Sequence, residues 1–331
     1  MRVLVGHHDF CFDGVASAAL FTRLHRHVEG AGHEYEYLGL SHGPDKTWND
    51  GVLTGEVNAV VDYRFLASPK LDWWFDHHRT AFEAPGDEAA FRADRSGKKF
   101  FDPDSKSCAR LIAEIGLEKF GVDWSFQQDL IERAHVIDGA LYPTAEEAAE
   151  SQSPAARIRM VLEGSRNRKL LLTILRGWVD SPLESVAAIP EIAAEADRLS
   201  VRESEARKIV RVSGRKAGAG GEVLVLDLVG KLDEGFSKFY AYAEYPEASY
   251  ILTLTASSSR VKIGIGFSPW CGRERLHDVS AICSRHGGGG HPVVGAISFP
   301  PGEIDRARGV IDEIVRELSA PPAAGMKSEK R

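Results

Sequence analysis

The feature that most constrains the fold is a series of short apolar runs, each of which stops at a polar side chain. The run 2–6 leads to His7, the run 57–61 ends at Asp62, and the run 73–75 ends at Asp76. Short apolar runs of this kind predict buried strands, and 35–38 predicts another. Apolar positions at helical spacing predict helices over 15–28 and near 105–120 and 126–138. Strands that alternate with helices predict an α/β fold, with an N-terminal, mostly parallel sheet flanked by helices.

The second half of the chain predicts a smaller α/β domain with a mixed sheet. Residues 189–209 combine apolar positions with alternating charges, which predicts a long, partly solvated connecting helix. The glycine-rich segment 214–221 predicts a turn. Beyond it, we expect strands and a final helix at 223–228, 250–255, 261–267 and 304–318. We therefore expect a first domain over 1–190, a helical linker over 191–220, a second domain over 221–320 and a disordered tail over 321–331.

Composition and charge exclude several classes of protein. The net charge of −7 argues against a protein that coats long duplex nucleic acid. No apolar run approaches the roughly 18–20 residues of a membrane span, and the N-terminal run is too short for a signal-peptide core. The four cysteines are too few and too scattered for a disulfide framework. These features favour a cytoplasmic protein without a membrane partner.

The ends of the predicted strands carry an unusual set of metal-binding side chains. His7, His8, Asp9, Cys11 and Asp13 follow the first strand, and His77 and His78 follow Asp76 directly. In an open parallel sheet, ligands bind beyond the carboxyl ends of the strands. Mixed carboxylate and imidazole ligands suit Mn²⁺, Fe²⁺, Co²⁺ or Zn²⁺, and several carboxylates together indicate two ions about 3.5–4 Å apart. A polar cluster without metal is the alternative.

These motifs together resemble the DHH phosphoesterase family. The family's name-giving motif matches Asp76-His77-His78, and Asp62 matches an aspartate that ends an earlier strand. The run Gly287 to His291 independently resembles the glycine-rich signature of the DHH-associated C-terminal domain. The resemblance extends from His7 to about Phe299 and implies a catalytic first domain and a substrate-binding second domain.

The resemblance also implies a set of site residues. The metal ligands would be His7, Cys11, Asp13, Asp62, His77 and Asp138, with Asp62 bridging two divalent ions and His8 competing with His7. As catalytic residues, Asp76 would orient His77, and His78 would face the substrate phosphate. Many members of the family have aspartate in place of Cys11. Because thiolate is a softer ligand, Zn²⁺, Fe²⁺ or Co²⁺ stand beside Mn²⁺ as candidate ions.

In the second domain, the predicted strand 261–267 has one apolar face and one face with Arg260, Lys262, Gly264 and Gly266. A ligand can approach such a glycine-containing face closely, although a solvated face is the alternative. From this face we expect Arg260 to contact substrate. The glycine run can present backbone N–H groups to an anion, so we also expect contacts from Gly288, Gly289, Gly290 and His291, with a flexible glycine linker as the alternative. Trp270 either stacks on a base or packs in the core.

The expected reaction is metal-dependent hydrolysis of a phosphate ester, by a water that two ions activate. Short oligoribonucleotides, cyclic dinucleotides and 3′-phosphoadenosine 5′-phosphate are the substrates that the resemblance implies. A polyphosphate or pyrophosphate hydrolase and a weakened nucleotide-binding sensor are the alternatives. A homodimer is compatible with this interpretation.

Overall fold

The computed structural model describes residues 1–41, 48–218, 220–232 and 236–320. The chain divides into two compact units, Met1–Tyr142 with Ser151–Ser200, and Pro143–Glu150 with Val201–Arg331. The division falls inside the long helix α9 (Pro190–Ser213). The segment Pro143–Glu150, placed in the first domain by the sequence analysis, clusters with the second unit. The expected tail, 321–331, lies outside the described residues.

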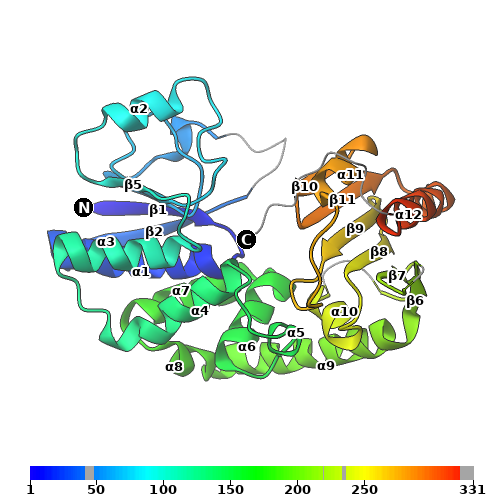
Figure 1. The fold of residues 1–331 in the computed structure, drawn as a ribbon. Helices are drawn as coiled ribbons and strands as arrows, with labels where there is room; N and C mark the ends of the chain where they lie inside the picture. Colours follow the sequence, from blue (N-terminus) through cyan, green and yellow to red (C-terminus); the bar gives the residue numbers. More distant parts are fainter. Residues whose placement is uncertain (42–47, 219, 233–235, 321–331) are drawn as a thin grey trace. The chain divides into compact units, whose positions relative to one another are not determined.

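The first unit is built on a five-stranded sheet in which every pair of neighbours is parallel. The order of its strands is β2-β1-β3-β4-β5 (Figure 1). Four of the strands match the predicted runs, whereas the three-residue strand β5 was not expected from the sequence. The strands are β1 (Arg2–His8), β2 (Glu34–Leu40), β3 (Val57–Val61), β4 (Trp73–Asp76) and β5 (Lys99–Phe101).

Both faces of this sheet are buried. Successive side chains along each strand point to opposite faces, and the two sets pack in two separate cores. Val5 and Val61 pack with the helices α1 (Phe12–Glu29) and α3 (Cys108–Phe120) on one face. Val60 and Trp74 belong to an aromatic cluster on the other face, where α2 (Asp87–Ala93) lies (Figure 1). Burial on both faces explains why these strands read as continuous apolar runs. The same alternation sends neighbouring side chains at the end of a strand, such as His7 and His8, to opposite faces of the sheet.

The helical elements of the first unit include the helices predicted near 15–28, 105–120 and 126–138. They are α1 (Phe12–Glu29), η1 (Asp50–Val52), α2 (Asp87–Ala93), α3 (Cys108–Phe120), η2 (Ser125–Gln127), α4 (Gln128–Asp138), α6 (Pro154–Met160), η3 (Val161–Ser165), α7 (Arg168–Asp180) and α8 (Leu183–Ala187). The expected connecting helix is α9. Its residue Ala196 packs in the core of the first unit, and its residue Val210 packs in a core of the second.

The second unit contains a mixed six-stranded sheet with the order β10-β11-β9-β8-β7-β6. Only β7 and β8 pair in parallel. The glycine-rich segment predicted as a turn supplies the edge strand β6, because its backbone pairs with β7. The strands are β6 (Gly214–Ala217), β7 (Val223–Asp227), β8 (Tyr250–Ala256), β9 (Val261–Phe267), β10 (Gly289–His291) and β11 (Val294–Phe299).

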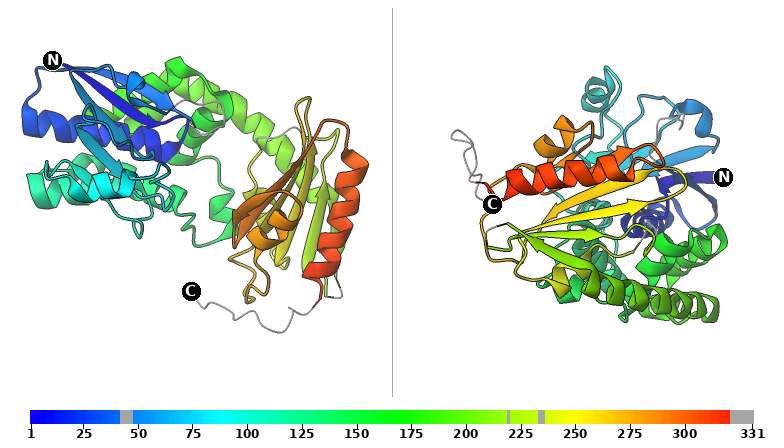
Figure 2. Two further views of the ribbon diagram at one scale, coloured as in Figure 1. Left: turned by 90° about the horizontal axis from the view of Figure 1, so that it is seen from above. Right: turned by 90° about the vertical axis from the view of Figure 1, so that its right-hand side faces the viewer.

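Helix α12 (Ile304–Leu318) covers one face of this second sheet (Figure 2). Val261, Ile263 and Ile265 of β9 pack with it in a buried core, which confirms the predicted apolar face. The opposite face of β9 carries Lys262, Gly264 and Gly266, as the alternation predicted. The remaining helices of the second unit are α5 (Ala145–Ala148), α10 (Phe239–Glu244) and α11 (Val279–Arg285). Among the described residues, no helix combines the length and the apolar character needed to cross a membrane.

Candidate metal centre and ligand pocket

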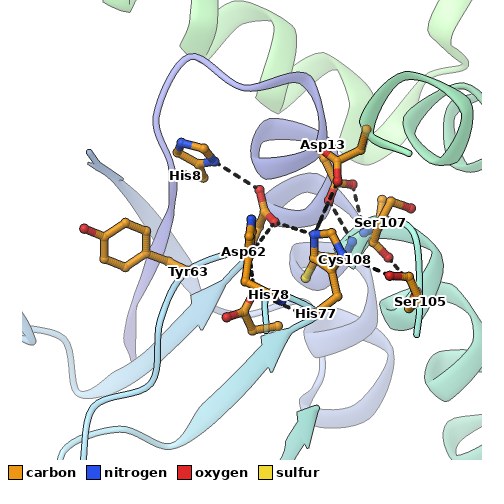
Figure 3. A network of polar contacts seen from close by, with 12 residues as sticks. His8, Asp13, Asp62, Tyr63, His77, His78, Ser105, Ser107 and Cys108 are labelled. Atoms are coloured by element: carbon orange, nitrogen blue, oxygen red, sulfur yellow. Dashed lines mark hydrogen bonds and ion pairs between the residues drawn. The ribbon is translucent and has the colours of Figure 1, made fainter. Parts of the chain in front are cut away.

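Asp62 lies at the centre of a buried polar cluster at the carboxyl edge of the first sheet. It follows β3 directly, is 1 % exposed and has a φ of 56°, a left-handed conformation that costs energy in a residue with a side chain. Its Oδ1 lies 3.4 Å from Nε2 of His77, and its Oδ2 lies 3.6 Å from Nδ1 of His8. Figure 3 shows the two imidazole rings on either side of this carboxylate. Each oxygen of Asp62 therefore faces a different histidine.

His77 is oriented so that Nε2 points into the cluster. Its Nδ1 lies 3.1 Å from the carbonyl oxygen of Ser105, an acceptor, so Nδ1 carries the proton and Nε2 carries the lone pair in the neutral ring. Nε2 lies 3.4 Å from Oδ2 of Asp138 and 3.8 Å from Oδ2 of Asp13. This is the arrangement in which a ligating histidine is held by its other ring nitrogen.

Asp13 is fixed by the start of helix α3. Its Oδ2 accepts a hydrogen bond from the backbone N–H of Cys108 at 2.7 Å, and its Oδ1 accepts one from Ala109 at 3.0 Å (Figure 3). Backbone N–H groups in the first turn of a helix have no partner within the helix and favour an anion. Ser107 caps the same helix by accepting a hydrogen bond from the backbone N–H of Arg110. Asp13 is thus anchored in place, while its side chain remains beside His77.

Within the described ranges of the chain, potential metal-binding atoms form three groups, within each of which all ligand atoms lie within 4.8 Å of one another. The groups are Asp13 with His77 and Asp138, His8 with Cys11 and Asp62, and Asp62 with Asp76, His77 and His78. Separations of this size are compatible with ligands about 2.0–2.3 Å from a shared ion. The structure therefore brings together five of the six predicted ligands, Cys11, Asp13, Asp62, His77 and Asp138.

The sixth predicted ligand, His7, lies outside all three groups. It is fully buried, and it continues the side of β1 on which Val3 and Val5 pack toward α1. Its Nδ1 lies 3.0 Å from the carbonyl oxygen of His8, and burial lowers its pKa to about 4. Because neighbouring residues of a strand point to opposite faces, His8 lies beside Asp62 instead. The structure thus places the competing histidine in the cluster.

The role expected for Asp76 also differs in the structure. Its Oδ1 lies 2.7 Å from Nδ1 of His78 and accepts a hydrogen bond from the backbone N–H of His77 at 2.8 Å. It therefore orients the ring of His78, whereas Ser105 orients the ring of His77. The sequence analysis missed Ser105 because the contact is made by its backbone carbonyl, which every residue type carries.

The charges in the cluster shift one another's titration strongly. Burial lowers the pKa of His77, but its contact with Asp62 and the charges of Asp13 and Asp138 outweigh burial and raise the pKa to about 10. Burial, followed by the charge of Asp62, raises the pKa of Asp138 to about 6 and that of Asp13 well above its usual value. Burial and the same carboxylate raise the pKa of the Cys11 thiol. Acids crowded in this way bind either protons or cations.

The donor set fits divalent metal ions. Both oxygens of Asp62 and Nε2 of His77 are buried and have no hydrogen-bond partner among the described residues. Their nearest partners are ion pairs at 3.4 Å or longer, whereas buried polar atoms are almost always hydrogen-bonded, so a bound cation would complete their contacts. Carboxylate and imidazole groups suit Mn²⁺, Co²⁺, Fe²⁺ and Zn²⁺, and the thiol of Cys11 adds a softer ligand to the group of His8.

The second unit contains a pocket of about 460 Å³ on the face of its sheet opposite to α12. Its lining includes Lys262, Gly264 and Gly266 from β9, and Gly289, Gly290 and His291 from β10. The glycines make room, because a Cβ on Gly266 would lie 2.0 Å from the hydroxyl of Tyr242. A pocket of this size accommodates a nucleotide-sized ligand.

Three of the five predicted substrate contacts, Gly289, Gly290 and His291, thus line this pocket. Gly288 lies one residue before β10, and an added Cβ there would lie 2.1 Å from the carbonyl oxygen of Ala296. Arg260 lies just before β9, and neither it nor Gly288 is a lining residue. The sequence analysis placed Lys262 on the correct strand face but did not select it. Trp270 packs edge-on against Tyr242, with 5.8 Å between ring centroids, and does not line the pocket.

The fold and the cluster define the class of the protein as a two-unit α/β protein with a candidate metal centre at a strand edge. No protein-family model matches the chain, and no curated protein matches it. Among solved structures, PggH, a pGpG-specific phosphodiesterase from Vibrio cholerae, is similar with a TM-score of 0.69 at 16 % identity. The match covers 96 % of this chain and 100 % of that chain.

Two further structures share the fold. A DHH domain from a protein described as a member of a family of ribosomal proteins has a TM-score of 0.58 at 13 % identity, over 97 % of this chain and 87 % of that chain. RecJ from Thermus thermophilus in complex with Mn²⁺ has a TM-score of 0.56 at 14 % identity, over 97 % of this chain and 53 % of that chain. The chain therefore has the fold of the DHH-domain proteins, as the resemblance in its sequence implied.

Proposed function

We propose that the protein is a metal-dependent phosphoric ester hydrolase that acts on small nucleotides. The observation that carries this proposal is the convergence of buried, unpartnered ligand atoms from Asp62 and His77 within the described residues. Three polar atoms buried without hydrogen bonds carry a cost in stability, and their ion pairs at 3.4 Å or longer offset it only in part. A divalent ion on each side of Asp62 satisfies them and concentrates positive charge where a phosphate could bind.

The two ions would be held by different groups. We assign one to Asp13, His77 and Asp138, the other to His8 and Cys11, and Asp62 to both, because each of its oxygens faces one group. Bound divalent ions lower the pKa of water and neutralise charge on a phosphate. Mn²⁺ is the first ion to test, since the similar RecJ structure contains it, and the thiol of Cys11 makes Zn²⁺, Fe²⁺ and Co²⁺ the next.

His78 would act on the substrate directly. Asp76 holds its Nδ1, which leaves Nε2 as the atom that could meet a phosphate or donate a proton to a leaving oxygen. Asp76 is then a positioning residue for His78.

The pocket of the second unit would bind a nucleotide. Lys262 and His291 supply donors for a phosphate, and the backbone of Gly289 and Gly290 can approach it closely. Ile251, Tyr242 and Phe236 supply apolar area for a nucleoside, which inorganic polyphosphate lacks. This composition favours a nucleotide over polyphosphate.

A linear dinucleotide is the first substrate to test, because PggH is described as specific for pGpG. The experiment incubates the protein with Mn²⁺ and, in separate reactions, pGpG, a second linear RNA dinucleotide, cyclic di-AMP, 3′-phosphoadenosine 5′-phosphate or polyphosphate. Chromatography of the products identifies the bond cleaved. We expect mononucleotides from a linear dinucleotide. Hydrolysis of polyphosphate alone would establish the phosphoanhydride alternative, and tight nucleotide binding without turnover would establish a sensor.

A further inference from the structure

The loop 9–11 joins β1 to α1 and carries Cys11 next to His8, so its conformation decides whether both side chains face Asp62. Its own backbone does not stabilise that conformation. Phe10 has a φ of 53°, a left-handed value that is unfavourable for a residue with a side chain. Helix α1 also begins without a side-chain hydrogen bond from its cap residue, Cys11. Strained loops of this kind persist only when surrounding contacts hold them.

Those contacts come from β2 and α7. The backbone N–H of Asp9 donates to the carbonyl oxygen of Leu40 at 2.9 Å. The Oδ1 of Asp9 accepts a hydrogen bond from Nη1 of Arg168 at 3.0 Å, and Nη2 of Arg168 donates to the carbonyl oxygen of Tyr37 at 2.6 Å. One guanidinium group therefore joins the loop to the edge strand β2. Its rigid fork matches two acceptors at fixed positions.

The neighbouring strand is shaped around this ion pair. A Cβ on Gly39 of β2 would lie 2.3 Å from Cγ of Asp9 and 2.6 Å from Nη1 of Arg168. Any residue other than glycine would displace the pair. The guanidinium of Arg166 also lies 5.9 Å from the ring centroid of Phe10, so the start of α7 and the segment just before it both contact the loop.

Arg168 does not stabilise its own helix, α7. It is the first residue of α7, where the helix dipole disfavours a positive charge. Asn167 already caps that helix by accepting hydrogen bonds from the backbone N–H groups of Lys169 and Leu170. The side chain of Arg168 is also 38 % exposed, and ion pairs at such exposure contribute little to stability. The pair is therefore better explained by the position of the loop than by the stability of the fold.

We propose that Arg168 is a positioning residue that acts through Asp9 to hold His8 and Cys11 against Asp62, and thereby sets the affinity of one metal ion. This inference rests on the metal centre of the proposed function but not on any particular substrate. It makes a selective prediction, because Asp13 and His77 of the other group are held by α3 and Ser105 and not by the loop.

The test is a titration of the metal-free protein with Co²⁺, followed by calorimetry and by the thiolate-to-cobalt absorption band. His8→Ala identifies which of the two ions belongs to the loop. We expect Arg168→Ala and Asp9→Ala to lower the affinity for that same ion by about 10- to 100-fold, the range seen when a residue that orients a ligand is removed. The affinity of the other ion should change by less than about twofold. In the double variant the losses should not add, since both changes break one contact.

Three further variants keep the test decisive. Gly39→Ala displaces the ion pair of Asp9 and Arg168 without removing a charge, and it should lower the affinity for the same metal ion. Arg168→Lys should recover part of the affinity, because an ammonium keeps the charge but lacks the two-pronged geometry. Arg26→Ala is the matched control, because Arg26 pairs with Asp180 at 3.0 Å and also joins α1 to α7, away from the loop.

The inference would be overturned if the variants lost affinity equally for both ions. It would also be overturned if folded Arg168→Ala and Gly39→Ala bound cobalt as the wild-type protein does. A wild-type protein that binds no divalent ion would overturn both this inference and the proposed function. A wild-type protein that binds two ions but hydrolyses no nucleotide would overturn the proposed function alone.

Discussion

Nε2 of His77 lies 3.4 Å from Oδ1 of Asp62, and neither atom has a hydrogen-bond partner within the described part of the chain. The two residues closely follow neighbouring strands, so the parallel pairing of β3 with β4 brings them to one edge. The contact between them is an ion pair in the metal-free protein and becomes a pair of ligands when a cation replaces the proton. The predictions below follow from this relationship and from the pocket in the second unit.

Asp62→Asn should abolish activity rather than weaken it. The change removes a charge that faces His8 and His77 at once, so both ions lose the negative charge of Asp62 and one of them also loses an oxygen ligand, which the amide nitrogen cannot replace. Because residues that only orient a ligand cost about 10- to 100-fold, we expect a loss of at least about 100-fold in kcat. Steady-state kinetics and metal analysis of the purified protein measure the effect. Asp129→Asn, which removes an exposed carboxylate paired with Arg133, is the control and should leave both unchanged.

Cys11 should set the preference of its group for a metal ion. Cys11→Asp replaces a soft sulfur by a hard oxygen, so the activity ratio of Mn²⁺ to Zn²⁺ should increase. Cys11→Ser should lower the affinity of that group for its metal ion by about tenfold or more. Activity with each metal and calorimetric affinities provide the measurement, with Cys271→Ser in the second unit as the control. If both Cys11 variants keep wild-type affinities, Cys11 only packs, and His8 and Asp62 hold that ion without it.

Metal binding should release protons and strengthen as the pH rises. In the metal-free protein the pKa of His77 is raised to about 10 and that of Asp138 to about 6, so at pH 7 His77 holds a proton that an ion must displace. The apparent affinity should therefore rise by up to about tenfold per pH unit for each proton displaced. Calorimetry in buffers of different ionisation enthalpy should find at least two protons released per chain at pH 7, one from His77 and one from the Cys11 thiol, which binds a metal ion as thiolate. An affinity that is constant from pH 6 to 9 would contradict this assignment.

The same shift determines how the metal-free fold responds to pH. The folded pKa of His77 lies above its ordinary value of 6.5, so its favourable interactions are fully present below about pH 6.5. They are lost as the pH rises toward about 10. The melting temperature of the metal-free protein should therefore fall over this window, whereas saturating metal should remove most of the dependence, because bound ions replace the proton. A melting temperature that rises with pH in the metal-free protein would oppose the predicted sign.

The sequence predicted the parts of this protein that depend on local pattern. Alternation over 261–267 gave the two faces of β9, and the apolar runs gave β1, β3 and β4 with Asp62 and Asp76 at their ends. The sequence analysis named His7 as a ligand and His8 as its competitor, whereas the structure places His8 in the cluster, because the outcome depends on which face of the sheet α1 covers. Packing of Val3 and Val5 toward α1 decides it.

What the sequence missed depends on contacts between distant segments. The turn expected at 214–221 includes the strand β6 because β7 offers it a pairing edge. Ser105 orients His77 through a backbone carbonyl, and Arg168 reaches Asp9 from a helix far along the chain. Neither residue belongs to a motif, so only the folded structure reveals their partners.

The last prediction separates Lys262 and His291 from Arg260 in the binding of substrate. Lys262 and His291 line the pocket of the second unit, whereas Arg260 belongs to the same charged stretch of sequence but does not line it. Lys262→Ala and His291→Ala should each remove a hydrogen bond to a charged phosphate, worth about 1.5–3 kcal/mol, and so lower kcat/KM by about 10- to 150-fold. Metal content should stay at the wild-type value, because neither residue belongs to the ligand groups. Arg260→Ala is the matched control and should lower kcat/KM by less than about threefold, which is less than one such hydrogen bond. Steady-state kinetics with the dinucleotide and metal analysis of all three variants measure these effects. If kcat/KM falls strongly in Arg260→Ala but stays at the wild-type value in Lys262→Ala, Arg260 contacts the substrate, as predicted from the sequence alone. The pocket lined by Lys262 would then not bind the substrate.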